Sequence, residues 1–559
     1  MDFDLVVRGG EILDGTGAKA YRADLGVCDG MIVAIGEIPT KGKREIDAKG
    51  CVVAPGFIDI HTHYDAQVFW DRMLSISPWH GVTTVLIGNC GFGVAPTRPE
   101  HRDLILRTLE NVEGMSLDCL REGLGEQWPF VAFGEYLDAI ESRGTAIHVG
   151  TLVGHTPVRT FVMGEAAVER EATPEEVAEM RALVEAALDA GALGFATSRA
   201  PTHIGYGGNP VPSRISSTAE VRALAGALRG RPQALLQVTI GADLWIDKLA
   251  EIQREIERPV TWTALLGGML GPTGHRKVLK DCAALQAEGV RVYPQVSGRP
   301  LMLEFQFSSP FPMAMLPAMK PVFAADDAGR RQLYADPAFR VQLRHEVDTT
   351  FGLFSFRQMW VSHAPGHADL VERKVPELAV EQGRHAVDIV LDLALATNLE
   401  ARFRMAVLNT DEDIVAELLR DPSTVLGLSD AGAHASQLCD AGASTHLLGH
   451  WVREKGVLTL EEAVRRLTSE PAALLGLMDR GRLAPGMFAD LVVFDPATVA
   501  CGPLRRVADL PGGADRLVAD ALGVRAVVVE GVPVRLDGRD AVDPAGPLPG
   551  RLLRAVRAA

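Results

Sequence analysis

Short apolar runs separated by tight turns occur at both ends of the chain. The N-terminal segments "DLVVRGGEILDG" and "REIDAKGCVVAPG" pair β-branched residues with Gly- and Asp-containing turns, a pattern typical of strands. The C-terminal segments "ADLVVFDP" and "VRAVVVEGVPVRLDG" repeat this texture. We therefore predict a small β-sandwich domain built from both chain ends, residues 1–56 and 481–559.

The middle of the chain, residues 57–480, alternates apolar strands with amphipathic helices. "ATPEEVAEMRALVEAALDAG" predicts a helix that begins after Thr173, with Glu176 completing a capping box, and ends at Gly191. A strand, "ALGFATS", follows directly, and "PQALLQVTI", "RPVTWTALL" and "GVRVYPQVS" continue the series. This alternation indicates an α/β fold with a parallel sheet, which we expect to close into a (β/α)8 TIM barrel. A doubly wound open sheet is the alternative, but no GxGxxG fingerprint supports it.

One irregular stretch interrupts the predicted barrel. "GRPLMLEFQFSSPFPMAMLPAMKPVF" is rich in Pro, Met and Phe, and a long segment without regular pattern inside a barrel enzyme is typical of a lid or substrate loop. We predict a lid around residues 298–325. The alternative is a packed excursion with no role in the reaction.

Composition narrows the function classes. The formal charge of −16 over 559 residues argues against a nucleic-acid partner, since nucleic-acid binding requires a basic surface. No apolar run reaches membrane-spanning length, and the acidic start Met1–Asp4 lacks the basic and apolar regions of a signal peptide. The seven cysteines form no CxxC pair. These features predict a reduced, cytoplasmic protein without a membrane association.

Two histidines stand at the end of the first strand of the predicted barrel, in "PGFIDIHTH". Residues two apart on a strand point to the same side, so His61 and His63 are expected to converge just beyond it. Convergent imidazoles commonly begin a zinc or other transition-metal site. A pair of surface loop histidines is the alternative.

Several motifs together resemble the amidohydrolase superfamily along nearly the whole chain. They are "PGFIDIHTH", the pair "SD" at the end of a late strand (Ser429 and Asp430), and the exit sequence "RGRLAPGMFADLVVFDP". Within that superfamily, "GVTTVLIGNCGFGVAP", "LVGHTPVR" and "DAGALGFATS" resemble the N-acyl-D-amino-acid deacylase (D-aminoacylase-like) branch.

The resemblance implies a metal site and its chemistry. It makes His61, His63, Cys90 and Asp430 the metal ligands, with zinc as the favoured ion and another divalent transition metal as the alternative. It also makes Asp430 the catalytic group, a general base and then a general acid in the hydrolysis of a linear amide. An N-acyl-D-amino acid, or a related hydrophobic N-acyl compound, is the implied substrate. If Cys90 binds no metal, a nucleophilic role is the alternative.

The chain departs from the family pattern where one histidine is expected from each of the fifth and sixth barrel strands. The corresponding strands, "ALLQVTIGAD" and "PVTWTALLGG", contain none. Gln237, Thr239, Trp262 and Thr263 stand there instead, and none of them is a good zinc ligand. One ion per chain is therefore the favoured prediction.

Other residues are candidates for replacing or supporting these ligands and for binding substrate. The candidate replacement or supporting residues are His155, His203, His434 and Asp65. No arginine follows Asp430 before Arg453, so the candidates for holding a substrate carboxylate are Arg299, Arg199 and Arg159. For each histidine and arginine a purely structural role is the alternative.

Two further functions remain open from the sequence. One is a ring-opening hydrolase of cyclic amides or imides, against which the "GNCG" loop and the missing strand-end lysine count. The other is a catalytically altered barrel that acts as a binding protein. Family analogy also suggests a homo-oligomer.

Overall fold

The structure is a computed structural model that describes residues 2–313, 316–349, 356–434 and 441–555. Its centre is a series of parallel strands in two sheets, one running from β6 to β8 and the other from β9 to β17, in each of which a strand pairs with the next of the series. These strands are β6 (Phe57–Asp59), β7 (Val82–Ile87), β8 (His148–Thr151), β9 (Val153–Gly154), β10 (Gly194–Ser198), β11 (Leu235–Thr239), β12 (Val260–Thr263), β13 (Val292–Val296) and β17 (Val425–Leu426). The predicted alternation of parallel strands and helices is confirmed.

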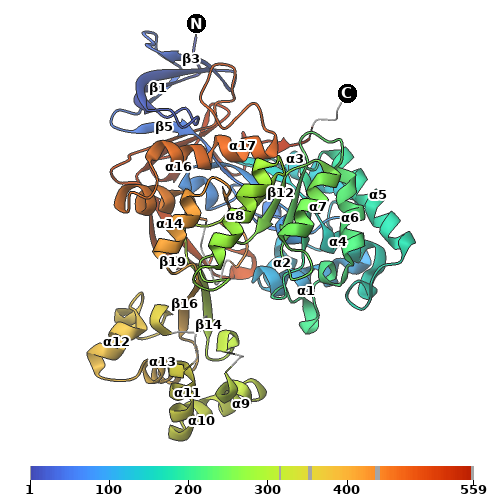
Figure 1. Ribbon diagram of the computed structural model, residues 1–559. Coiled ribbons are helices and arrows are strands. Elements are labelled where there is room, and N and C mark those ends of the chain that lie inside the picture. The colour runs from blue at the N-terminus through green and yellow to red at the C-terminus, as the bar shows by residue number, and fades with distance from the viewer. Residues whose placement is uncertain (1, 314–315, 350–355, 435–440, 556–559) are drawn as a thin grey trace.

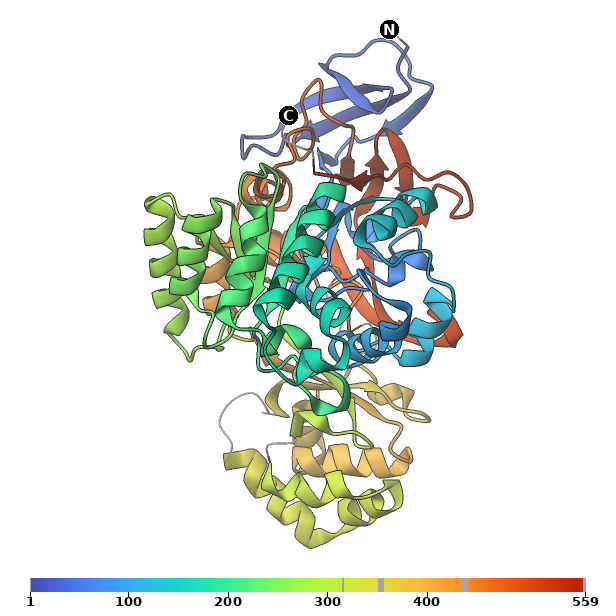
Figure 2. The same cartoon turned by 90° about the vertical axis from the view of Figure 1, so that its right-hand side faces the viewer.

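Helices surround these strands in Figures 1 and 2. The main ones are α3 (Phe133–Arg143), α4 (His155–Met163), α5 (Pro174–Ala190), α6 (Thr218–Ala225), α7 (Ile246–Ile256), α8 (Gly274–Ala287), α14 (Glu412–Arg420), α16 (Leu460–Leu467) and α17 (Ser469–Leu475). Helix α5 begins and ends where the sequence predicts, because the Thr173 side chain accepts from the N–H of Glu176 and Gly191 adopts a left-handed C-cap. Among the described residues, no helix is both long and apolar enough to span a membrane.

The two chain ends share a nine-stranded sheet at the top of Figure 1. Its strands are β1 (Leu5–Ile12), β2 (Tyr21–Cys28), β3 (Met31–Gly36), β4 (Arg44–Asp47), β5 (Val52–Pro55), β18 (Leu491–Phe494), β21 (Val524–Val529), β22 (Val532–Leu536) and β23 (Arg539–Asp540). The ends meet where β5 and β18 pair antiparallel, with Val53 opposite Val493 and both side chains fully buried. Strands from the two chain ends thus share one sheet, while the β-sandwich domain of residues 1–56 and 481–559 stays a prediction.

Two parts of the C-terminal segment 481–559 lie outside that sheet. Strands β19 (Ala500–Val507) and β20 (Arg516–Leu522) form a separate antiparallel hairpin. Strand β24 (Leu552–Leu553) pairs in parallel with β8, so the chain returns to the central strands near its end. There Leu552 is buried, which indicates that apolar contact with the central strands holds this segment.

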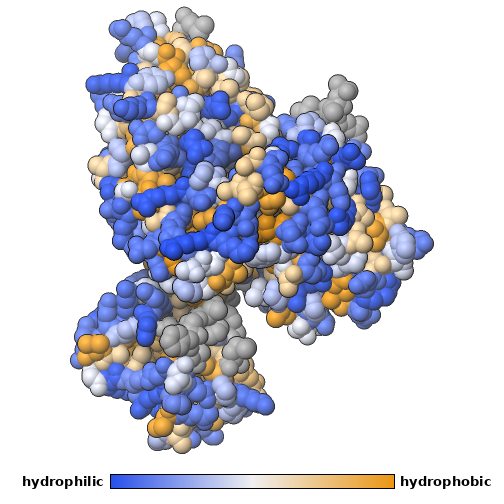
Figure 3. Space-filling model, in the orientation of Figure 1, coloured by the Kyte–Doolittle hydropathy of each residue, from blue (hydrophilic) through white to orange (hydrophobic). Residues whose placement is uncertain are grey.

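The irregular stretch begins a larger insertion than the lid expected around residues 298–325. An antiparallel sheet of β14 (Leu301–Gln306), β16 (Arg402–Leu408) and β15 (Met359–His363) carries, among the described residues of this segment, five α-helices. These helices are α9 (Lys320–Ala324), α10 (Asp327–Ala335), α11 (Pro337–Thr349), α12 (Val375–Gln382) and α13 (Ala386–Ala396). Much of the Phe and Met content that suggested a lid packs inside this unit, which has its own apolar core around Phe307 and Phe403. Figure 3 shows it as a separate lobe with a largely hydrophilic surface.

Candidate metal centre

The two histidines lie on the segment that follows β6, held between neighbouring strands. The N–H of Thr62 donates to the carbonyl of Leu86 (3.1 Å), and the N–H of His63 donates to that of Ala431 (2.7 Å). This segment thus bridges the end of β7 and the chain beyond β17. The Nε2 atoms of His61 and His63 lie 3.3 and 3.6 Å from the same carboxylate oxygen, Oδ1 of Asp430, so the two imidazoles converge on one point.

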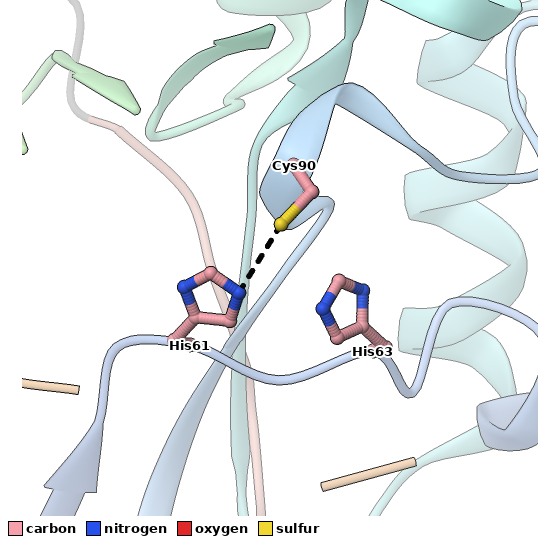
Figure 4. A group of neighbouring side chains, drawn as sticks. All are labelled: His61, His63 and Cys90. Carbon is pink, nitrogen blue, oxygen red and sulfur yellow. Dashed lines mark hydrogen bonds between the residues drawn. The ribbon is translucent and has the colours of Figure 1, made fainter. Parts of the chain in front are cut away.

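Cys90 completes the cluster from the turn after β7, the short helix η3 (Asn89–Gly91). Its Sγ lies 3.4 Å from Nε2 of His61, and the ligand atoms of Cys90 and the two histidines all lie within 4.8 Å of one another. Figure 4 shows the sulfur directed at the two rings. Gly88 makes this turn possible, because it has a φ of 85° and a Cβ there would lie 2.1 Å from the carbonyl oxygen of Leu152.

Each histidine has a partner on its other nitrogen. Nδ1 of His61 lies 2.8 Å from Oε1 of Gln295, on β13, and Nδ1 of His63 lies 3.1 Å from Oε1 of Glu113, at the end of α1 (Arg102–Glu113). The Gln295 oxygen accepts, so a proton on the His61 ring belongs on Nδ1, and the Glu113 carboxylate stands at ion-pair distance from the His63 ring. Burial lowers the pKa of His63, but Glu113, Asp430 and Cys90 outweigh it and raise that pKa well above its usual value. Both Nε2 atoms offer lone pairs to a metal ion once the rings are deprotonated, as metal binding requires.

Cys90 and Asp430 have unusual pKa values and unusual backbone conformations. Burial raises the pKa of the Cys90 thiol, but the His61 and His63 rings more than offset burial and bring that pKa to about 7. Burial likewise opposes ionisation of Asp430, yet the same imidazoles hold its pKa far below its usual range. Cys90 and Asp430 also have left-handed backbones, with φ of 57° and 47°, a strained conformation that concentrates at functional sites.

Removal of the Glu113 side chain should weaken metal binding. Substitution Glu113→Ala is expected to lower zinc affinity about 10- to 100-fold, because His63 loses the group that orients its ring and raises its basicity. Glu113→Gln keeps an acceptor and should cost less. Chelator competition measures both affinities, with the exposed Glu100→Ala as the control; equal affinities for Glu113→Ala and the control would contradict this role for Glu113.

A neutral hydrogen-bond network fills the position of the absent fifth- and sixth-strand histidines. Oε1 of Gln237 accepts from the N–H of Cys90 at 2.7 Å, and its Nε2 donates to Thr263 Oγ1 at 3.4 Å. Thr263 donates in turn to Oγ1 of Thr239 at 3.1 Å. Trp262 is fully buried on the same strand. These contacts support the Cys90 turn and offer no anionic or imidazole ligand for a second ion.

Three of the four candidate replacement or supporting residues lie around the cluster. Asp65 accepts from the N–H of Gly88 at 3.2 Å, beneath the Cys90 turn, and burial raises its pKa to about 7. The N–H of His434 donates to the carbonyl of Glu113. His203 packs against Phe92 with 5.0 Å between ring centroids, and the Phe92 ring lies 6.5 Å from that of His63.

His155 and Arg159 instead form a structural cluster on α4. Nδ1 of His155 lies 2.8 Å from Oγ1 of Thr197, and its Nε2 lies 2.8 Å from Oε1 of Glu220. The fully buried Arg159 donates to the same Glu220 oxygen at 2.6 Å. With both ring nitrogens and the guanidinium engaged, the structure brings neither residue to the histidine pair.

Neutralising Glu220 should destabilise the protein. In Glu220→Gln the buried charge of Arg159 loses its counter-ion, for which we expect a loss of about 3–5 kcal/mol in the free energy of unfolding. Urea denaturation measures this loss. The control Glu185→Gln breaks an exposed ion pair with Arg181 and should cost under about 1 kcal/mol; a similarly small loss for Glu220→Gln would contradict the prediction.

The remaining two arginine candidates also have partners elsewhere. Arg199 forms an ion pair with Asp243 and donates to the carbonyl of Ser213 at 3.2 Å. Arg299 donates to Sγ of Cys501, on β19, at 3.3 Å. Neither of these contacts involves the metal centre, and the substrate-binding role of both arginines stays a prediction.

Sequence reasoning missed the two partners of the histidines. Gln295 had a signal, since it is a polar residue inside the apolar strand "VRVYPQV" and is fully buried. No sequence signal marked Glu113, because a glutamate in the last turn of an amphipathic helix is expected to be exposed to solvent. Only the fold brings its carboxylate, on α1, beside His63.

Comparison with known proteins agrees with this geometry. The model of the amidohydrolase family matches residues 44–535. D-aminoacylase from Alcaligenes xylosoxydans xylosoxydans is 31% identical to this chain, and the alignment covers 95% of this chain and 94% of the D-aminoacylase chain. A solved N-acyl-D-glutamate deacylase from Bordetella bronchiseptica, complexed with zinc and a phosphonate inhibitor, superposes with a TM-score of 0.67 at 26% identity, over 99% of this chain and 100% of its own. A D-aminoacylase structure matches with the same values, and its description reports a binuclear centre with one-metal activation and second-metal attenuation.

Proposed function

Since the chain belongs to the amidohydrolase family, we propose that it is a one-metal deacylase of N-acyl-D-amino acids or related hydrophobic N-acyl compounds. The observation that carries this proposal is the convergence of His61, His63, Cys90 and Asp430 on one point. The reactions named for the D-aminoacylase and N-acyl-D-glutamate deacylase relatives support the substrate class.

The donor set fits zinc. Two neutral imidazole nitrogens, a thiolate and a carboxylate are ligands that zinc accepts together in a four-coordinate site. The partners of His61 and His63 on their Nδ1 atoms are those that metal-binding histidines have. The neutral Gln237 and threonine network on β11 and β12 supports one ion rather than two. Another divalent transition metal remains the alternative.

The chain's own residues account for the proton transfers. A bound zinc ion supplies polarisation of the scissile carbonyl and acidification of water. Asp430, with its low pKa, is ionised at neutral pH and accepts the proton of the attacking water. The protonated carboxyl then donates to the leaving nitrogen, so that a carboxylic acid and an amino acid are released. Gln295 and Glu113 keep the two imidazoles in place throughout.

We also propose that the central strands close into an eight-stranded barrel. A parallel bridge between Thr62 and Ala431 joins the chain beyond β6 to that beyond β17, the first and last strands of the series. Strands β8 and β9 are separated by a single residue and act as one strand. This arrangement places the ligands at the carboxyl ends of the strands, where such barrels carry their chemistry.

A substrate panel tests the proposed function. Zinc-loaded protein is expected to hydrolyse N-acetyl-D-amino acids, and removal of the metal with a chelator should abolish this activity until zinc is restored. N-acetyl-L-amino acids and dihydrouracil, a cyclic amide, serve as comparisons. Turnover of the cyclic compound alone would favour the ring-opening alternative, and zinc binding without any turnover would favour the binding-protein alternative.

A further inference from the structure

Two fully buried side-chain amides hold the turn that carries Cys90. The first belongs to Asn89, whose Nδ2 donates to the carbonyl of Leu86 at 2.8 Å and to that of Thr62 at 3.3 Å. Leu86 lies on β7, and Thr62 stands between the two candidate metal histidines. One amide therefore ties the Cys90 turn both to the strand before it and to the histidine segment.

The second amide belongs to Gln237, on β11. Its Oε1 accepts from the N–H of Cys90 at 2.7 Å, and its Nε2 donates to Oγ1 of Thr263 at 3.4 Å. A flipped amide would turn its NH2 group towards a backbone donor, so the contact with Cys90 fixes the orientation of the side chain. Gln237 stands on a strand from which the family pattern expects a histidine, and here its side chain meets the backbone of a candidate ligand.

The backbone of Cys90 depends on this support. Its φ of 57° lies in the left-handed region, which is unfavourable for a residue other than glycine and persists only where the surroundings enforce it. Loss of the Gln237 oxygen would take the acceptor from a buried N–H, which is also unfavourable, and the backbone would rotate to relieve it. Since the sulfur moves with the backbone, its position 3.4 Å from Nε2 of His61 depends on this hydrogen bond (Figure 4).

We propose that Asn89 and Gln237 are positioning residues that hold the Cys90 sulfur at the histidine pair before zinc binds. This inference rests on the metal site of the proposed function and not on its substrate. Gln237 fixes the backbone of Cys90, and Asn89 fixes the turn against the histidine segment. Because the sulfur is already in place, zinc binding does not have to reorder the turn, and the two amides raise zinc affinity.

Cobalt(II), bound in place of zinc, tests the proposal by absorption spectroscopy. A thiolate bound to cobalt gives a charge-transfer band in the near ultraviolet, whereas the visible bands report bound cobalt with or without a sulfur ligand. Gln237→Leu removes the acceptor for the N–H of Cys90, and Asn89→Ser removes the donor that reaches Thr62. We expect both variants to bind cobalt about 10- to 100-fold more weakly than the wild-type protein, with a weaker charge-transfer band at saturating cobalt.

Two further variants separate positioning from a general loss of stability. Gln237→Glu keeps an acceptor for the N–H of Cys90 and should keep the charge-transfer band. Gln253→Leu makes the same change as Gln237→Leu at a buried glutamine on α7, and it should leave both the band and the cobalt affinity unchanged. Urea denaturation of every variant measures the loss of stability independently.

The outcomes separate this inference from the proposed function. Wild-type affinity together with an undiminished band in Gln237→Leu or Asn89→Ser would overturn the positioning role of that residue, even where stability falls. If Gln237→Leu does not fold, Asn89→Ser decides by the same two measures. If the cobalt-loaded wild-type protein shows no charge-transfer band, Cys90 is not a ligand, and this inference fails with the proposed metal site. A wild-type protein that shows the band but hydrolyses no amide would contradict the proposed function alone.

Discussion

Asp430→Asn is expected to lower kcat by about 10²- to 10⁴-fold. The amide keeps an oxygen that faces the His61 and His63 nitrogens, but it cannot accept the proton of the attacking water. Because the imidazoles hold the pKa of Asp430 far below its usual range, the wild-type carboxylate is ionised throughout the neutral range, and pH adjustment cannot rescue the variant.

The measurement for Asp430→Asn is kcat at saturating substrate, with zinc content determined on the same sample. The exposed Asp369→Asn, in the insertion, is the control. A variant that retains its zinc and turns over within tenfold of the wild-type protein would rule out Asp430 as the proton acceptor. A variant that loses its zinc as well would show that the ligand role of Asp430 dominates.

Cys90→Ser is expected to weaken zinc binding more than about 100-fold. Loss of a residue that only hydrogen-bonds to a metal ligand can already cost up to about 100-fold, and Cys90 is proposed as a ligand itself. The thiolate is the softest ligand of the set, and at a pKa of about 7 it is available at neutral pH. The serine hydroxyl stays protonated at this pH and binds zinc poorly.

The assay for Cys90→Ser is competition with a chromogenic zinc chelator. Cys28→Ser is the matched control, because Cys28 lies in the sheet at the N-terminus, well before Cys90 in the sequence. Zinc affinity unchanged in Cys90→Ser would remove the thiolate from the ligand set and leave the two histidines and Asp430. Activity lost with zinc affinity unchanged would instead favour the nucleophilic role for Cys90.

The candidate ligand set could be proposed from the sequence because local motifs, and the family resemblance that they carry, mark it. His61 and His63 stand two apart after a strand, and Cys90 sits in a glycine-flanked turn after the next strand. The partner of each histidine could not be predicted, because Gln295 lies 234 positions from His61 and the two side chains meet only in the folded protein. Tertiary packing, not local pattern, decides such pairs.

Contacts between residues distant in the sequence also decide whether the candidate arginines are free to bind a substrate. The position of Arg159, Arg199 and Arg299 after predicted strands makes them candidates, but the sequence does not show that Glu220, Asp243 and Cys501 fold against them.

The sequence predicts a lid around residues 298–325, whereas the structure shows a larger insertion with its own core. Its first residues lack regular periodicity, and the Pro/Met/Phe content suggested a lid. In the structure, Phe305 and Phe307 pack against residues nearly 100 positions later, such as Phe403, in a core of their own. A separate core of this kind becomes visible only when distant segments are paired, as β14 and β16 are here.

Anomalous diffraction at the zinc edge, on crystals grown with excess zinc, tests the central claim most directly. We predict one strong peak, bound by Nε2 of His61, Nε2 of His63, Sγ of Cys90 and the carboxylate of Asp430. No peak among these four groups, or a second peak of equal height against Gln237 and Thr263, would contradict the one-metal site.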